Sequence, residues 1–269
     1  MTTVRDIYDC MDEKAPFSMQ ESWDSSGLLV GRWDKAVRRA LLSLDITPLV
    51  IQEAADMGCD LIISHHPVIF GGTKSVTDAD YTGERVLRLA ERGIAALCCH
   101  TCLDAAPGGV NEVLARLCGL EGELELLEQG GVHPVLGPYG IGRVGALKAP
   151  MALGDYLNLL NRRLRPNGIR FHDAKRPVRR VAVGGGSCGS MMGEVLKLGC
   201  DTFVTADLKY DHFLEARSAG LNLIDAGHYP TENPAMDVVD LWLSERFPQV
   251  EILRTRSHSE PISYQSSSF

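Results

Sequence analysis

Short apolar runs alternate with stretches of helical periodicity along most of the chain. The apolar runs have the length of buried strands, and in the first part of the chain they cover residues 37–45, 59–64 and 94–99. Helical spacing covers residues 3–14, 83–91 and 110–118, and Thr47-Pro48 reads as an N-cap with proline at the first helical position. Strands that alternate with helices of this length predict parallel βα units. The fold class is therefore α/β.

The second part of the chain repeats this plan. Val37-Arg38-Arg39 recurs as Val178-Arg179-Arg180, and Gly58-Cys59-Asp60 recurs as Gly199-Cys200-Asp201, at the same separation. This repeat predicts two βα half-domains of related topology, although two α/β units can also match through shared patterning alone. We expect a first half over residues 1–125, a glycine- and proline-rich linker over 126–150, a second half over 151–264 and a frayed tail over 265–269.

Composition and charge exclude several classes of protein. The 269 residues are 45% hydrophobic, which is enough for a sizeable core, and no apolar run approaches the roughly 20 residues of a membrane helix. The net charge of −8 without a basic block argues against a nucleic-acid partner. The N-terminus lacks the pattern of a signal peptide, so we expect a cytoplasmic protein with its eight cysteines reduced. Cys99 and Cys102 form a Cys-x-x-Cys, which we interpret as buried thiols.

Two adjacent histidines follow the strand Leu61-Ile62-Ile63-Ser64. Neighbouring side chains on a strand point to opposite faces, so His65 and His66 are better placed to hold two separate metal ions than one. The alternative is that one histidine caps a turn and the other is a core residue. Two more polar clusters follow strands, and ligand sites in α/β sheets lie beyond the carboxyl ends of strands. Together the three strand ends predict one crevice with these side chains: His65, His66, His100, Asp104, His228 and Glu232.

Imidazoles combined with carboxylates suit zinc, manganese, iron or nickel better than calcium. The set therefore predicts a dinuclear site. The loop Gly184-Gly185-Gly186-Ser187 lies between a strand and a helix, where its backbone N–H groups would suit an anion, or where it forms only a tight turn.

Four motifs occur in order along the chain: Trp-Asp-x-x-Gly-Leu-Leu-Val-Gly from Trp23, Ser-His-His-Pro from Ser64, His-Thr-x-Leu-Asp from His100 followed by Gly-Gly-Val-Asn, and Gly-His-Tyr-x-Thr-Glu from Gly227. Together they resemble the Nif-three-like dinuclear-metal family, also named GTP cyclohydrolase I type 2 homologues. The resemblance implies five ligands: His65, His66, Asp104, His228 and Glu232. We pair His66 with Asp104 on one ion and His65 with His228 on the other, with Glu232 bridging. The resemblance also implies two α/β halves with the site between them, and a ring-shaped homohexamer. Longer members of the family carry an inserted middle domain, for which this chain has no room.

The chain departs from the family pattern at a few positions. Ser25 and Cys102 stand where asparagine is usual, and neither change removes a ligand. The segment from Ala206 to His212 resembles Gly-Asp-x-Lys-Tyr-His-Asp, with the glycine replaced and the last two residues reversed, so a role for His212 near the site is in doubt. His100 is retained, and we assign it either to a position that supports the metal ligands from behind or to a substrate-side, catalytic role.

The predicted function is that of a metal-dependent hydrolase. Two divalent ions per chain would activate a bridging water against a small nucleotide or phosphoester-like molecule. The alternative is a non-catalytic metal-binding or partner-binding scaffold, because no general base or nucleophile is obvious beyond the metals.

Overall fold

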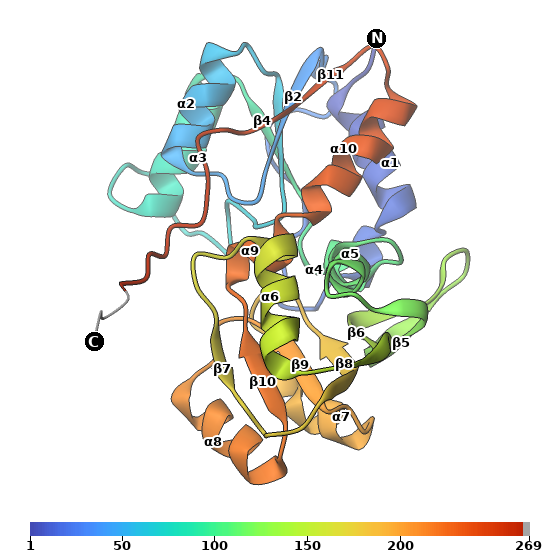
Figure 1. Ribbon diagram of the computed structural model, residues 1–269. Helices are drawn as coiled ribbons and strands as arrows, with labels where there is room; N and C mark the ends of the chain where they lie inside the picture. Colours follow the sequence, from blue (N-terminus) through green and yellow to red (C-terminus); the bar gives the residue numbers. More distant parts are fainter. Residues whose placement is uncertain (266–269) are drawn as a thin grey trace. The chain divides into compact units, whose positions relative to one another are not determined.

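The computed structural model describes residues 1–265, which form two compact units. The first unit contains Met1–Ala106 and Met236–Ser259, and the second contains Pro107–Ala235 and residues 260–265. Each unit is built on its own sheet with helices packed against it (Figure 1). Sequence and structure therefore agree on an α/β protein with two sheets.

The first unit holds a five-stranded sheet in the order β1-β4-β3-β2-β11. Its strands are β1 (Gly27–Val30), β2 (Arg39–Ser43), β3 (Leu61–Ser64), β4 (Ala95–Cys98) and β11 (Glu251–Arg254). All neighbours are parallel except β1, which runs antiparallel to β4. Its helices are α1 (Val4–Lys14), η1 (Phe17–Met19), α2 (Pro48–Asp56), α3 (Tyr81–Glu91), α4 (Thr101–Ala105) and α10 (Ala235–Arg246, from its second residue). Thr47 caps α2 through the N–H of Val50, as the Thr-Pro pair predicts.

The second unit holds a six-stranded sheet in the order β5-β6-β8-β9-β10-β7. Its strands are β5 (Glu121–His133), β6 (Gly137–Met151), β7 (Arg170–His172), β8 (Val178–Val183), β9 (Thr202–Thr205) and β10 (Asn222–Asp225). Its helices are α5 (Val110–Leu117), α6 (Leu153–Leu164), η2 (Gly189–Met191), α7 (Met192–Lys197), α8 (Tyr210–Ala219) and α9 (His228–Glu232). Successive side chains of β9 and β10 point to opposite faces of the sheet and enter two different hydrophobic clusters. Val204 and Ile224 belong to the cluster of Leu160, whereas Phe203 and Leu223 belong to the cluster of Val195.

The predicted repeat appears in the strand topology and in hydrogen bonds from backbone N–H groups to two aspartate side chains. The parallel order β4-β3-β2 matches β10-β9-β8, and an antiparallel strand is added beside β4 and beside β10. Asp60 accepts hydrogen bonds from the N–H groups of Arg38 and Arg39. Asp201 accepts the corresponding bonds from Arg179 and Arg180. The recurring Gly-Cys-Asp therefore ties two parallel strands together in each unit.

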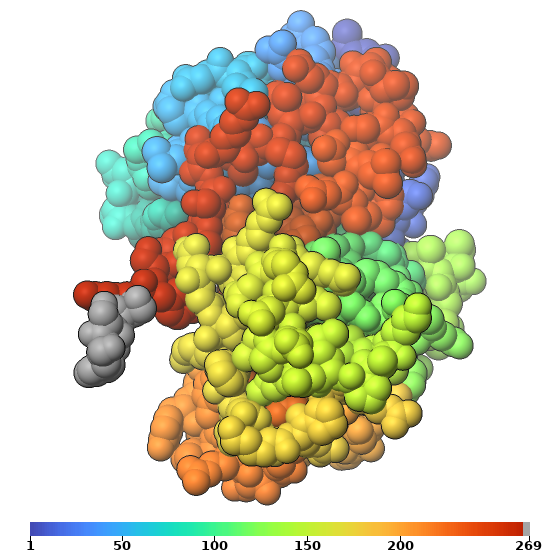
Figure 2. Space-filling model, in the orientation of Figure 1, coloured from blue at the N-terminus to red at the C-terminus, as the bar shows by residue number. Residues whose placement is uncertain are grey.

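The boundaries between the units differ from the predicted halves. Residues 126–150 are not a linker, because they form most of the β5–β6 hairpin that pairs with β8. Their glycines serve close strand pairing: a Cβ on Gly140 would lie 2.0 Å from the carbonyl oxygen of Glu128. Helix α5 belongs to the second unit, whereas α10 and β11 belong to the first. In Figure 2 the red atoms of this late segment lie among the blue atoms of the first unit.

Two further expectations can be compared with the described residues. All eight cysteines are buried, Cys99 and Cys102 included, which agrees with their interpretation as core thiols. No helix within residues 1–265 is long and apolar enough to cross a membrane. The predicted frayed tail falls almost entirely on residues 266–269, outside the described residues.

Candidate metal centre

Three imidazoles converge in the first unit. His65 and His66 directly follow β3, and His100 follows the neighbouring parallel strand β4, so the strand ends bring them to the same edge of the sheet. One ring nitrogen from each lies within 4.8 Å of the others. Their ring centroids are 4.9 to 5.5 Å apart. This spacing suits donors gathered around a metal ion.

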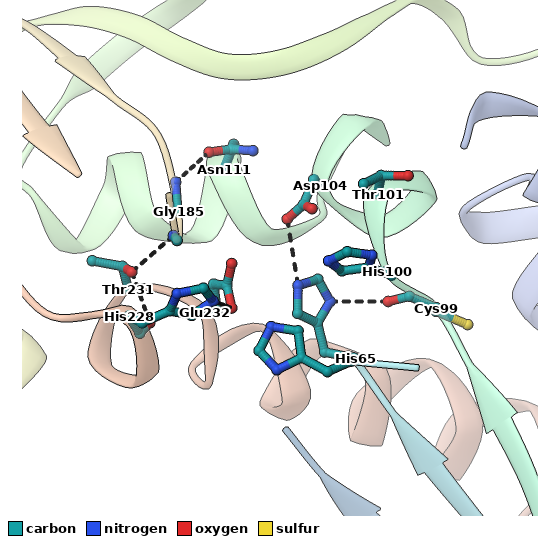
Figure 3. Close-up of polar contacts among 12 residues, drawn as sticks. His65, Cys99, His100, Thr101, Asp104, Asn111, Gly185, His228, Thr231 and Glu232 are labelled. Carbon is teal, nitrogen blue, oxygen red and sulfur yellow. Dashed lines mark hydrogen bonds and ion pairs between the residues drawn. The ribbon is translucent and has the colours of Figure 1, made fainter. Parts of the chain in front are cut away.

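Each of the three rings is oriented through its Nδ1 atom. His65 Nδ1 lies 2.9 Å from the carbonyl oxygen of Cys99, as Figure 3 shows, His66 Nδ1 lies 2.8 Å from Asp45 Oδ1, and His100 Nδ1 lies 2.7 Å from Asp24 Oδ1. These oxygens only accept, so Nδ1 carries a proton, and in the neutral form of each ring the lone pair is on Nε2. Metal-binding histidines are held in the same way, with a carbonyl or carboxylate on the second ring nitrogen. His65 and His66 therefore fit metal ligands, and the same orientation suits His100 either as a ligand or as a proton acceptor.

Asp24 fixes His100 from a fully buried position. Its side chain has no solvent exposure and also accepts hydrogen bonds from Ser26 Oγ and from the backbone N–H and hydroxyl of Thr101. Burial alone would raise the pKa of Asp24, but the bonds from His100 and Thr101 outweigh it and hold the pKa well below its usual range. Asp24 therefore remains a carboxylate beside the His100 ring.

Asp45 plays the same part for His66. Its other oxygen lies 2.7 Å from His258 Nε2, so one carboxylate joins two imidazoles. Burial would raise the pKa of Asp45, and the hydrogen bonds to His258 and His66 lower it well below its usual range. Asp45 follows β2, and the strand-end argument could have found it, whereas His258 lies beyond the last strand and no pattern in the sequence indicated it.

Asp104 lies in the short helix α4 that follows His100. The helix is buried, and Asp104 Oδ1 lies 3.7 Å from His65 Nε2 (Figure 3). The sequence-based pairing placed Asp104 with His66 instead. The first unit thus brings together four of the predicted residues: His65, His66, His100 and Asp104.

The remaining two predicted ligands meet in the second unit. His228 and Glu232 begin and end α9, and their Nε2 and Oε2 atoms lie 2.9 Å apart across one helical turn. His228 Nδ1 lies 2.7 Å from Asp207 Oδ2. Burial alone would lower the pKa of His228, but the hydrogen bonds to Asp207 and Glu232 outweigh it and raise the pKa to about 11. A metal ion that bound the His228 imidazole would have to displace the proton that this raised pKa keeps on the ring.

The glycine loop after β8 packs against Glu232 and does not form the anion cradle that its composition suggested. The N–H groups of Gly184, Gly185 and Gly186 donate to Val204, Asn111 and Thr231, respectively, and two of these bonds are drawn in Figure 3. A Cβ on Gly186, which has φ +62°, would lie 2.1 Å from Glu232 Oε1. Glycine is therefore required here to make room for the carboxylate.

His212 contributes to the N-terminal end of α8. Its Nδ1 atom accepts a hydrogen bond from the N–H of Lys209 at the start of α8. The sequence did not indicate a role for Asn111, which accepts a hydrogen bond from Gly185, or for Asp207, which contacts His228. Both residues lie inside the motifs quoted above.

The comparisons with known proteins identify the family. The family model for Duf34/NIF3 (NGG1p interacting factor 3) matches residues 2–261. The chain belongs to the Duf34/NIF3 family. This NIF3-family chain is 30% identical over 263 residues to a "GTP cyclohydrolase 1 type 2 homolog" of Clostridium perfringens, covering 97% of the chain and 99% of the relative. It is 35% identical over 245 residues to a protein of the same name from Streptomyces coelicolor, covering 87% and 83%.

Solved structures show the NIF3 fold over the full length. A Staphylococcus aureus protein, SA1388, has a TM-score of 0.87 and 28% identity, with 98% of this chain and 99% of that chain covered. A Bacillus cereus protein related to NIF3 has a TM-score of 0.88, 22% identity and the same coverage, which shows likeness of fold alone. The family resemblance drawn from the four motifs is thereby confirmed.

Proposed function

We propose that this NIF3-family protein is a metal-dependent hydrolase that acts on a small phosphoester or nucleotide-like molecule. The observation that carries the proposal is the set of three imidazoles in the first unit, each with Nδ1 bound to a carbonyl or carboxylate oxygen. A purely structural cluster has no need for three rings held in the same way, whereas two metal ligands, His65 and His66, with a proton acceptor, His100, beside them depend on it. The names of the curated relatives point to hydrolytic chemistry on a nucleotide, which is a proposal for this chain.

We propose two divalent ions per chain, which the ligand chemistry restricts to zinc, iron, manganese or nickel. Because Asp104 lies 3.7 Å from His65, we assign these two residues to one ion, in place of the sequence-based pairing. His66 and His228 are assigned to the second ion, and Glu232 to a bridging position. The assignment of His228 and Glu232 to the same centre rests on the family resemblance.

Divalent ions bound at these residues would supply Lewis acidity and would lower the pKa of a bound water to near neutrality. The protein supplies orientation and a proton acceptor. His100 Nε2 carries the lone pair of the neutral ring, and Asp24 holds that ring in place through Nδ1. His100 is therefore our catalytic residue, taking a proton from the attacking water or returning one to the leaving group. We further propose a cytoplasmic homohexamer, on the family resemblance.

Reloading of metal-free protein tests the proposal. The chain is treated with chelator, desalted and supplied separately with Zn²⁺, Mn²⁺, Fe²⁺ or Ni²⁺, and each form is assayed against phosphomonoesters, phosphodiesters and nucleotides. We expect hydrolysis only after reloading, its loss in His65→Ala, and its retention in His172→Ala, a histidine of β7 in the other sheet. If no loaded form hydrolyses any of these compounds while metal still raises the melting temperature, the scaffold alternative is correct.

A further inference from the structure

Two large aromatic side chains stand exposed beside the three histidines. Trp23 is 55% exposed and Phe70 is 62% exposed, and their ring centroids lie 5.8 Å apart at an interplanar angle of 48°. The His100 ring lies 6.1 Å from Trp23 and 6.2 Å from Phe70. All three residues belong to the first unit. The two aromatic rings are thus immediate neighbours of the imidazole that we assign to catalysis.

The exposure of Trp23 and Phe70 is built into the local structure. Trp23 directly precedes Asp24, whose side chain is fully buried and held by His100 and Thr101. Phe70 directly precedes Gly71, whose N–H donates to Ser25 Oγ at 3.3 Å. His100 and Thr101 therefore hold the residue next to Trp23, and Ser25 in the same loop holds the residue next to Phe70, while both rings keep more than half of their surface in solvent.

We propose that Trp23 and Phe70 form a stacking subsite for a planar aromatic or heteroaromatic ring of the substrate. This inference rests on the proposed function, because it places the ring beside the group that is cleaved. Aromatic rings attract one another at centroid distances of 4.5 to 7 Å in offset or edge-to-face geometry, and a tilted pair offers both. A cationic ligand would be repelled by divalent ions at the histidines, so the ring is neutral or belongs to an anionic molecule.

A pair of hydroxamates tests the subsite without requiring turnover. Benzohydroxamate and cyclohexanecarbohydroxamate carry the same zinc-chelating group and six-membered rings of similar size, but only the first ring is flat. Their dissociation constants are measured by titration calorimetry on the full chain loaded with Zn²⁺. The saturated ring is the more hydrophobic, so burial alone would not favour the planar ring, and the part of the preference that is lost with the two aromatic side chains reports stacking. We expect benzohydroxamate to bind about three- to tenfold more tightly.

Variants assign that preference to the two rings. Trp23→Ala and Phe70→Ala should each reduce it to less than about twofold while the affinity for the saturated ligand stays constant. Trp23→Leu serves if the alanine variant fails to fold. Trp33→Ala and Phe171→Ala, which remove other exposed aromatic residues at 39% and 49% exposure, should retain the preference.

Equal binding of both hydroxamates, or no binding of either to protein shown to contain zinc, would overturn the subsite. The same holds if the preference persists without Trp23 and Phe70, or if these variants change only the oligomeric state by light scattering. Failure of the subsite and failure of the proposed function are distinguishable. A preference without hydrolysis leaves the subsite standing alone, and hydrolysis without a preference leaves the function standing alone.

Discussion

Asp24 and His100 form a carboxylate–imidazole pair, with 2.7 Å between Asp24 Oδ1 and His100 Nδ1. The pair joins the loop before β1 to the segment after β4, which are antiparallel neighbours in the sheet. Because the carboxylate also binds Thr101, it fixes both the tautomer of His100 and the start of α4, the helix that carries Asp104. Asp24 of the Trp-Asp motif therefore positions His100 and α4, although Asp24 is not itself a proposed metal ligand.

Asp24→Asn tests that positioning role. The amide oxygen can still accept on one side, but the amide NH₂ group then meets a donor at His100 or at the Thr101 N–H, so the ring loses its fixed orientation. We expect kcat/KM for the metal-dependent hydrolysis to fall by about 10- to 100-fold at an unchanged metal content. Asp34→Asn, at an exposed aspartate, is the control. Full activity in Asp24→Asn would remove Asp24 from the mechanism.

Glu232→Gln separates a catalytic centre from a structural one. If the ions are catalytic, the variant should lose hydrolysis with a modest change in melting temperature. If the ions only stabilise the fold, its melting temperature should fall strongly, because an ion that binds only the folded state contributes roughly 4 kcal/mol at a thousandfold excess over its dissociation constant. We expect lost activity, measured alongside differential scanning calorimetry. Glu245→Gln in α10 is the matched control.

The Asp60 carboxylate should stabilise the first unit in a pH-dependent way. Burial alone would raise the pKa of Asp60, but its bonds to the N–H groups of Arg38 and Arg39 and the charge of Lys35 lower it. A lowered pKa means that the stabilisation is present above the unfolded value of about 3.9 and is lost as the pH falls through the folded value.

Asp60→Asn should therefore lower the free energy of unfolding by about 1–2 kcal/mol at pH 7 and by clearly less at pH 3, as measured in urea. Asp201→Asn should have a similar effect at pH 7, because Asp201 makes the repeated bonds in the second unit. An effect of Asp60→Asn that is the same at both pH values would contradict this explanation.

The assembly prediction is a closed homohexamer. It follows from the family resemblance, and it agrees with the closed point-group symmetry of most soluble homo-oligomers. Light scattering coupled to size-exclusion chromatography should give six times the chain mass across micromolar concentrations. A monomer throughout that range would count against it.

The sequence predicted the elements and the proposed ligands through local patterns. His65, His66 and His100 were found because chemistry in α/β folds gathers at strand ends, and the repeated Asp60 and Asp201 indicated the shared topology. Membership of β11 in the first sheet was not predictable, because its pairing with β2 joins residues about two hundred positions apart. The β5–β6 hairpin was mistaken for a linker, since glycines required for close strand contact resemble those of a flexible loop. His258 was missed for the same reason as β11: its partner Asp45 is distant in sequence.

Metal content is the most direct test of the central claim. The full chain is stripped with chelator, saturated with Zn²⁺, desalted and subjected to elemental analysis together with His65→Ala, and His172→Ala as control. The proposed dinuclear centre predicts two zinc ions per chain in the unmodified protein and in the control, and at most one in His65→Ala. One ion or none per chain in the saturated, unmodified protein would contradict it.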